Sequence, residues 1–207
     1  MIPFADLWPI ILGWAIAVGS PGPAVLAIAG ASMGAGRKSG LALSFGVWNG
    51  SIVWASVAAL GFGAAMASHA WLFETLRYLG AGYLLFIAFK SAKSALGGSA
   101  AHITPSSDSM GRAWRRGFLI HVMNPKAALF WGALFAVVIP QSAEKAAVVQ
   151  VGLSCLFTSL VVMSFMAIVF STRLMAQSYL RMHRVFDGAF SGLFGFAALK
   201  VVTSKLV

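Results

Sequence analysis

Six apolar segments follow one another along this chain, each close to the about 20 residues that a helix needs to cross the hydrocarbon core of a membrane. They cover residues 7–33, 41–66, 71–96, 117–140, 146–171 and 185–204. Charged residues make up 10% of the chain, against about 25% in a soluble domain. Because backbone groups in lipid must be satisfied within the chain, these segments predict helices. We therefore expect an all-α integral membrane protein, with six transmembrane helices in a single domain over 1–207 and a polar linker at 97–111.

Positive charge is distributed unevenly between the connections. Most of the 15 Lys and Arg residues fall after the first, third and fifth segments. The positive-inside rule places such connections in the cytoplasm, so both termini are expected outside. A net charge of +10 in a soluble protein would suggest nucleic acid, but here it is explained by orientation. We expect the lipid bilayer as a partner and no nucleic acid.

With three segments in each half, the two halves would enter the membrane in opposite orientations, which is typical of the inverted repeats of secondary transporters. Each half also carries one proline-interrupted segment, the first and the fourth. Small residues at Gly188, Gly192 and Gly195 recur along the last segment, and small residues of this kind let helices pack closely. That packing could lie within one protomer or between two, so a homodimer is one expectation.

Two proline triplets interrupt the first and fourth segments. Their residues are Pro21, Gly22 and Pro23 in the first segment, and Asn124, Pro125 and Lys126 in the fourth. Proline removes a backbone hydrogen bond, and the carbonyl and amide groups that it frees can coordinate a ligand. Prolines in membrane helices are also tolerated as simple kinks, so either break alone could be structural.

Lys126 is the one basic residue that lies deep within a predicted segment. A helix rises about 15 Å from Arg116 to Lys126, half of the about 30 Å hydrocarbon core, and about 16 Å from Met33 back to Gly22. Both breaks are therefore expected near the midplane, where transporters bind substrates. A charge at this depth indicates function, and a lysine suits a carboxylate, although its side chain could also extend toward an interface.

Three uncharged polar residues are further candidates for substrate binding. Asn49 and Ser51 lie in the second segment, and they could contact a ligand or form hydrogen bonds between helices. Tyr83 lies in the third segment, where it could line a pocket or anchor the helix.

Proton coupling has three candidates. His121 lies one turn before the second proline triplet and could carry a proton, or could be held by a structural hydrogen bond. Lys126 is the second candidate. Asp187, at the cytoplasmic end of the sixth segment, is the third; it could meet Arg184, or pair with Lys126 if the fourth and sixth segments touch.

Sequence signatures of enzymes and cofactor sites are missing. The chain has no Walker A loop, no GxSxG motif and no His/Cys/Asp/Glu cluster with metal-ligand spacing. Its single cysteine, Cys155, rules out an internal disulfide and a CxxC redox pair. We therefore expect no enzymatic activity, no cofactor and no metal.

Four stretches together resemble the LysE/RhtB family of amino-acid exporters. They are SPGPAVLAIAGASMGAGRKSGLALSFGVWNG, LRYLGAGYLLFIAFKSAK, RRGFLIHVMNPKAALFWGALFAVVIP and FDGAFSGLFGFAALKV. They contain a PGP triplet, a basic loop, a GxxYL pattern and an NPK triplet, in the order of the family and over nearly the whole chain. The resemblance implies that the two proline triplets are the family's motifs.

The resemblance implies a bacterial inner-membrane exporter of amino acids or their derivatives, driven by the electrochemical gradient with proton exchange. Two positions depart from the common pattern, because many members have Asn where this chain has Ala24 and an acidic residue where it has Ser51. A neutral pocket with one lysine favours an anionic or zwitterionic substrate that is recognised through its carboxylate. An exporter of another small organic solute or ion, and a non-transporting membrane scaffold, are the alternatives.

Overall fold

The computed structural model describes residues 2–20, 22–68, 70–97, 106–139, 144–182 and part of 184–199. This part of the chain is helical and contains no strand. Its helices are α1 (Phe4–Gly19), α2 (Pro23–Ala35), α3 (Arg37–Ser68), α4 (Ala70–Gly97), α5 (Met110–Val122), α6 (Pro125–Val138), α7 (Lys145–Val169) and α8 (Arg173–Arg181).

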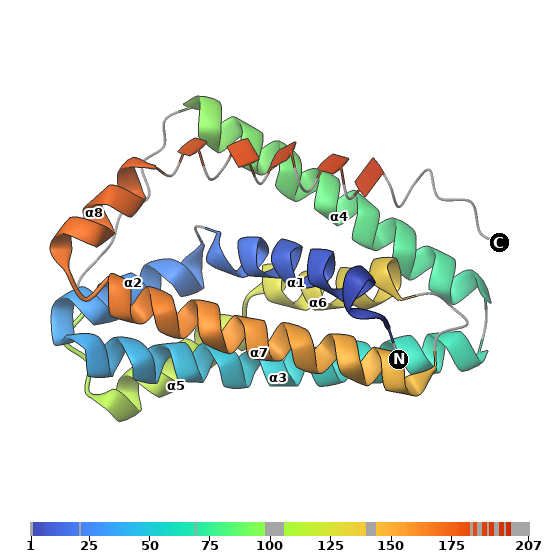
Figure 1. The fold of residues 1–207 in the computed structure, drawn as a ribbon, viewed down its shortest axis with the longest axis horizontal. Coiled ribbons are helices and arrows are strands. Elements are labelled where there is room, and N and C mark those ends of the chain that lie inside the picture. Colours follow the sequence, from blue (N-terminus) through green and yellow to red (C-terminus); the bar gives the residue numbers. More distant parts are fainter. Residues whose placement is uncertain are drawn as a thin grey trace.

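The long helices run along the longest axis of the molecule (Figure 1). Helix α3 packs against α2, α5, α6 and α7, and α1 packs on α7. In Figure 1, α1 and α6 lie between α4 and the group formed by α3, α5 and α7. Helix α1 therefore packs on α7, and α6 packs against both α3 and α4.

Two consecutive helix pairs are bent sharply at the predicted breaks. Helices α1 and α2 meet at 62°, and α5 and α6 meet at 65°. Helix α2 begins at Pro23 and α6 at Pro125. Proline suits the first position of a helix because its missing N–H would have no partner inside the helix there. The predicted interruption of the first and fourth segments is thus confirmed.

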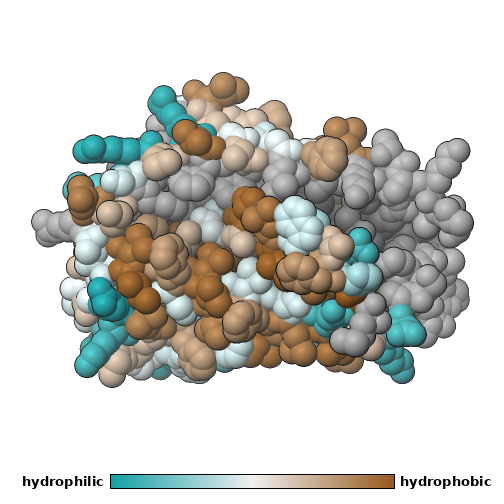
Figure 2. All heavy atoms as spheres, in the orientation of Figure 1, coloured by the Kyte–Doolittle hydropathy of each residue, from teal (hydrophilic) through white to brown (hydrophobic). Residues whose placement is uncertain are grey.

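The surface of the described helices is suited to lipid. Two single helices, or up to four spans if each bent pair counts as one, are long and apolar enough to cross a membrane. Helix α7 exposes a stripe of large apolar side chains at helical spacing, formed by Val149, Leu153, Phe157, Val161, Phe165 and Ile168. Figure 2 shows hydrophobic side chains over the middle of this face and hydrophilic ones toward both ends of the long axis. A hydrophobic band between polar ends is typical of a membrane-spanning protein.

Glycines bring α3 and α5 into close contact. A Cβ added at Gly46 would overlap the carbonyl oxygen of Trp114, and one added at Gly117 would overlap the carbonyl oxygen of Leu43. These helices can approach so closely because neither glycine has a side chain. The close crossing fixes the position of α5 just before the break that leads into α6.

Helix α1 is held on α7 by polar contacts. The backbone N–H of Ile2 donates to Gln150 Oε1 at 2.8 Å, and the Gln150 side-chain amide donates back to the Ile2 carbonyl at 3.1 Å. Near the other end of α1, the indole N–H of Trp14 donates to Ser159 Oγ at 2.8 Å. These contacts fix the α1 side of the break relative to α7.

The polar linker that was predicted at 97–111 is shorter than expected at its C-terminal end. Helix α5 already begins at Met110, because its first turns are rich in arginine and a search for apolar runs does not detect them. Just before it, the Ser106 N–H donates to the Gly30 carbonyl at 3.0 Å, and Ser39 Oγ donates to the Asp108 carbonyl at 3.1 Å. Residues 106–109 are therefore docked on α2 and α3, while 98–105 lie outside the described part.

The remaining helix expectations differ in how far the structure tests them. The second, third and fifth segments correspond to α3, α4 and α7. Helix α8, a short amphipathic helix after α7, was not predicted. About half of the sixth segment, 185–204, lies outside the described residues, so the count of six spans and the inverted halves stay predictions.

Candidate functional site

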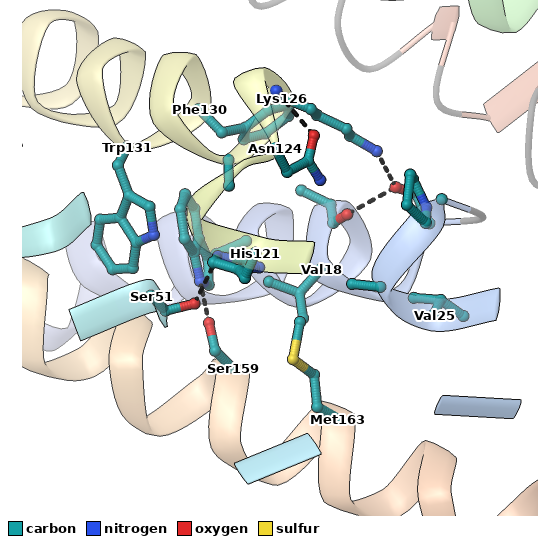
Figure 3. A pocket seen from close by; sticks show the side chains of 17 residues that line it. Val18, Val25, Ser51, His121, Asn124, Lys126, Phe130, Trp131, Ser159 and Met163 are labelled. Atoms are coloured by element: carbon teal, nitrogen blue, oxygen red, sulfur yellow. Dashed lines mark hydrogen bonds between the residues drawn. The ribbon is translucent and has the colours of Figure 1, made fainter. Parts of the chain in front are cut away.

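A cavity of about 70 Å³ lies where the two bent helix pairs meet. Side chains from α1, α2, α3, α5, α6 and α7 line it (Figure 3). The α1–α2 break contributes Ser20, Gly22 and Pro23, and the α5–α6 break contributes Asn124 and Lys126. The structure therefore brings the two sequence breaks to one site.

Ser20, which follows α1, forms the direct polar link between the breaks. Its hydroxyl donates to the Ala17 carbonyl at 2.8 Å, and its oxygen accepts a hydrogen bond from Lys126 Nζ at 2.6 Å. The first bond turns the hydroxyl proton toward α1 and leaves a lone pair for the lysine. Gly22 lies beside this contact, because a Cβ added there would be 3.8 Å from Lys126 Nζ.

The residues of the Asn124–Pro125–Lys126 triplet have different roles: one caps α6, one begins it, and one extends its side chain into the cavity. Asn124 is the N-cap of α6, and its Oδ1 accepts the Lys126 backbone N–H at 3.0 Å. Pro125 is the first helical residue. The Lys126 side chain extends from the start of α6 toward the break between α1 and α2 (Figure 3), and its Nζ lies 5.9 Å from the ring centroid of Phe130. The local geometry of the triplet thus directs a cation into the cavity.

The lining is electropositive at this position. Among the described residues that line the cavity, Lys126 is the one with a formal charge, and none carries a carboxylate. The N-terminal residues of α2 and α6 also face the cavity, and helix N-termini bear a partial positive charge. Such an arrangement binds a carboxylate or another small anion well.

A second polar position is formed by Ser51 of α3 and His121 of α5. Ser51 Oγ lies 3.0 Å from His121 Nε2, and both side chains are buried, with 2% and 8% of their surface exposed. The indole N–H of Trp54 donates to the His121 carbonyl at 3.3 Å. His121 Nδ1 is buried and has no hydrogen-bond partner in the described structure.

Aromatic and apolar side chains fill the wall between these polar positions. Trp14 and Trp131 contact each other with ring centroids 4.5 Å apart, and Phe130 packs edge-on against Trp14. Val18 and Met163 complete the apolar wall. Sequence reasoning missed these residues because they come from α1, α6 and α7, and no spacing within one segment relates them.

The other predicted site residues lie elsewhere or outside the description. Asn49 does not line this cavity. Its Oδ1 instead accepts the Trp114 indole N–H at 2.9 Å in a contact between α3 and α5. Tyr83 lies on α4, but its side chain is outside the described part of the chain. Pro21 and Asp187 are also outside the described residues. Among those described, no three His, Cys, Asp or Glu side chains lie close enough to share a metal ion.

Comparison with known proteins finds relatives along nearly the whole chain. The chain is 27% identical to a threonine efflux protein of Salmonella typhi over 197 residues, which cover 92% of this chain and 94% of that protein. It is 25% identical to a threonine efflux protein of Escherichia coli K12 over 194 residues, with the same coverage. It is also 30% identical to a leucine efflux protein of Salmonella choleraesuis over 130 residues, 63% of this chain and 61% of that protein.

No solved structure matches the chain. The sequence pattern of the LysE type translocator family matches residues 15–205. This range includes both helix breaks and every described residue that lines the cavity except Trp14. The chain therefore belongs to the LysE type translocator family.

Proposed function

We propose that this protein is a secondary active exporter of amino acids or amino-acid derivatives across the bacterial inner membrane, with the substrate bound in the cavity between the two breaks. The observation that carries the proposal is the convergence of two proline-broken helices on a cavity whose described lining contains one cation, Lys126. Relatives named threonine and leucine efflux proteins support the substrate class.

Lys126 would bind the substrate carboxylate. In the structure Lys126 Nζ donates to Ser20 Oγ at 2.6 Å, and a carboxylate is a stronger acceptor than a neutral hydroxyl. A bound carboxylate would compete with Ser20 for the ammonium group, with help from the helix N-termini of α2 and α6. Substrate binding would thus act directly on the contact that joins the two breaks.

The size of the cavity supports a small substrate. A cavity needs a volume of about 10–15 Å³ to hold one water molecule, so the 70 Å³ of this cavity correspond to about five to seven water-sized groups. That is fewer than the heavy atoms of threonine or leucine, so the cavity would have to expand slightly to bind an amino acid of that size. The aromatic wall of Trp14, Phe130 and Trp131 would contact an apolar or small side chain.

Energy coupling is proposed to come from the proton gradient. His121 and Lys126 are the ionisable side chains among the described residues of the lining, and both are candidates for carrying the exchanged proton. Asp187 remains a candidate from the sequence. Both chain termini would lie in the periplasm, as the distribution of basic residues predicts.

A second candidate function is export of a small organic anion that has no amino group. The absence of a carboxylate among the described lining residues favours it, since a substrate ammonium would meet no opposite formal charge there. A non-transporting scaffold is the remaining alternative, and it predicts no flux of any solute.

The test is an efflux measurement in bacterial cells that are loaded with mixed dipeptides, so that hydrolysis raises every free amino acid. The proposal expects expression of the protein to speed the appearance of a defined group of amino acids in the medium, and Lys126→Gln to abolish the effect. The matched control is Lys145→Gln at the exposed start of α7, which should behave as wild type. Equal efflux with and without protein in the membrane would refute the amino-acid assignment.

A further inference from the structure

One residue of the cavity lining, His121, has a buried hydrogen-bonding atom that the described structure does not satisfy. His121 Nδ1 is enclosed and lacks a partner, although the other ring nitrogen lies 3.0 Å from Ser51 Oγ. Leaving a buried polar group unpaired is costly, and native proteins rarely do so without a functional reason. Here the residue also lines the proposed substrate cavity, so a ligand group is a natural partner for this atom.

Contacts with α3 fix the position of His121. A Cβ added at Gly50 would lie 2.9 Å from His121 Cβ, so the glycine makes room for the histidine against α3. Trp54 donates to the His121 carbonyl from the same helix. Ser51 holds the ring through Nε2. Contacts from about one turn of α3 thus orient one imidazole at the cavity wall.

An amino-acid substrate brings an ammonium group that needs hydrogen-bond acceptors. The other side-chain acceptors of the described lining are already engaged by protein donors. Ser20 Oγ accepts from Lys126 Nζ, Asn124 Oδ1 from the Lys126 backbone N–H, and Ser159 Oγ from the Trp14 indole. A neutral imidazole that donates from Nε2 to Ser51 keeps a lone pair on Nδ1, which suits an ammonium donor.

We propose that His121 Nδ1 accepts a hydrogen bond from the substrate amino group, and that a proton competes with the substrate for the same lone pair. This inference rests on the proposed function and specifies its mechanism. The substrate would be bound at both ends, with its carboxylate at Lys126 and its ammonium at His121. The apolar wall between them would contact the side chain.

Competition for one lone pair would couple the two fluxes. When the amino acid leaves on the periplasmic side, a proton can take its place on Nδ1, and the resulting imidazolium repels an ammonium. When the site faces the cytoplasm, loss of that proton restores the acceptor for the next substrate. Each turnover would then exchange one proton for one amino acid, with no covalent step.

Lys126 is the ionisable side chain that shares the described cavity lining with His121. Among the described residues, α6 contributes Lys126 to the shared cavity, and α1, α2, α3 and α7 contribute no ionisable side chain to its lining. Asp187 lies outside the described residues and is the rival acceptor for the ammonium. Because protein atoms cover Nδ1, contact with a substrate also requires the cavity to expand.

Two substitutions at His121 separate the acceptor from the proton site. Asparagine places its Oδ1 where Nδ1 lies, so His121→Asn keeps an acceptor but cannot bind the proton. His121→Leu removes both. The full-length protein would be reconstituted in liposomes, and uptake of an amino acid identified by the efflux screen would be measured as counterflow and as accumulation driven by a pH gradient.

His121→Asn is expected to retain counterflow, to lose accumulation driven by the pH gradient, and to lose the weakening of counterflow at acidic pH. His121→Leu is expected to raise the half-saturating amino-acid concentration about tenfold to a hundredfold, as for loss of a hydrogen bond to a charged group. Inhibition by the matching carboxylic acid that lacks the amino group should be unchanged. Ser51→Ala should shift amino-acid affinity in the same direction by a smaller factor.

Thr158→Val is the matched control, because Thr158 Oγ1 donates within α7 to the Ser154 carbonyl and does not line the cavity. Proton-driven accumulation by His121→Asn, or wild-type affinity in His121→Leu, would overturn the inference. The inference would also be overturned if Asp187→Asn produced these effects and the substitutions at His121 produced none. Absence of counterflow in the wild type would instead refute the proposed function itself.

Discussion

Replacing Gly117 by alanine should drive α3 and α5 apart at their closest approach. The added Cβ would overlap the carbonyl oxygen of Leu43 and lie 3.1 Å from the backbone nitrogen of Val47. Both atoms belong to the backbone, so no side chain can rotate to make room, and the helices must separate by on the order of 1 Å. Since Ser51 lies on α3 and His121 on α5, the same separation would lengthen their 3.0 Å contact.

The expected loss of stability follows from the rigidity of this contact. Overpacking costs about 1–3 kcal/mol, and a clash with backbone belongs at the upper end, about 3 kcal/mol. For a chain of about 200 residues this corresponds to a Tm lower by about 6–12 °C. Cys155 gives a direct assay, because it is the single cysteine of the chain and is fully buried, so a thiol-reactive dye labels it when the protein unfolds.

The control is Gly13→Ala in α1, where an added Cβ meets no atom within 4 Å. Alanine in a helix interior is favoured over glycine by about 0.5–1 kcal/mol, so the Tm should stay unchanged or rise slightly. A Gly117→Ala protein that unfolds within about 1 °C of wild type would show that the α3–α5 crossing tolerates a side chain, and the reasoning would be refuted.

Three further substitutions test other contacts. Gly22→Leu would extend a side chain beside Lys126 Nζ and should abolish efflux, while size-exclusion chromatography shows a folded protein. Ser159→Ala leaves the Trp14 indole N–H without its acceptor and should lower the free energy of unfolding by about 1–3 kcal/mol in the thiol assay. Asp108→Asn removes an ion pair with Arg116 on the partly exposed surface and should change that free energy by less than about 1 kcal/mol.

The strongest predictions from sequence were those with a local physical cause. Pro23 and Pro125 cannot donate the backbone hydrogen bond of a helix interior, and both stand at the first position of a new helix. The rise per residue placed both breaks at similar depth, and the hydrogen bond between Ser20 and Lys126 shows that they meet. Ser20, directly before the first triplet, could have been found from its position.

Features that depend on packing between segments were beyond the sequence pattern. Asn49 and Ser51 lie two residues apart on α3. Ser51 forms a hydrogen bond with His121 in the cavity lining, whereas Asn49 forms one with Trp114, and neither Asn49 nor Trp114 lines the cavity. Which of two neighbouring polar residues faces a cavity depends on the rotation of the helix against α5. The apolar stripe of a soluble helix would indicate that rotation, but a membrane helix is apolar on all sides.

Helix ends in polar surroundings were also difficult to predict. The start of α5 contains Arg112, Arg115 and Arg116, so the apolar run begins well after the helix does. Helix α8 is short and amphipathic and carries no long apolar run at all. Hydropathy detects the part of a helix that lies in lipid and misses the turns that continue into the polar boundary.

The most direct test of the central claim is a comparison of two ligands on two proteins. Equilibrium binding to the purified protein would be measured for the exported amino acid and for its amide, which lacks the carboxylate, on wild type and on Lys126→Gln. If Lys126 in the cavity binds the substrate carboxylate, the wild type should prefer the acid over the amide by about tenfold to a hundredfold, and Lys126→Gln should lose that preference. An equal preference for the acid in both proteins would contradict the account.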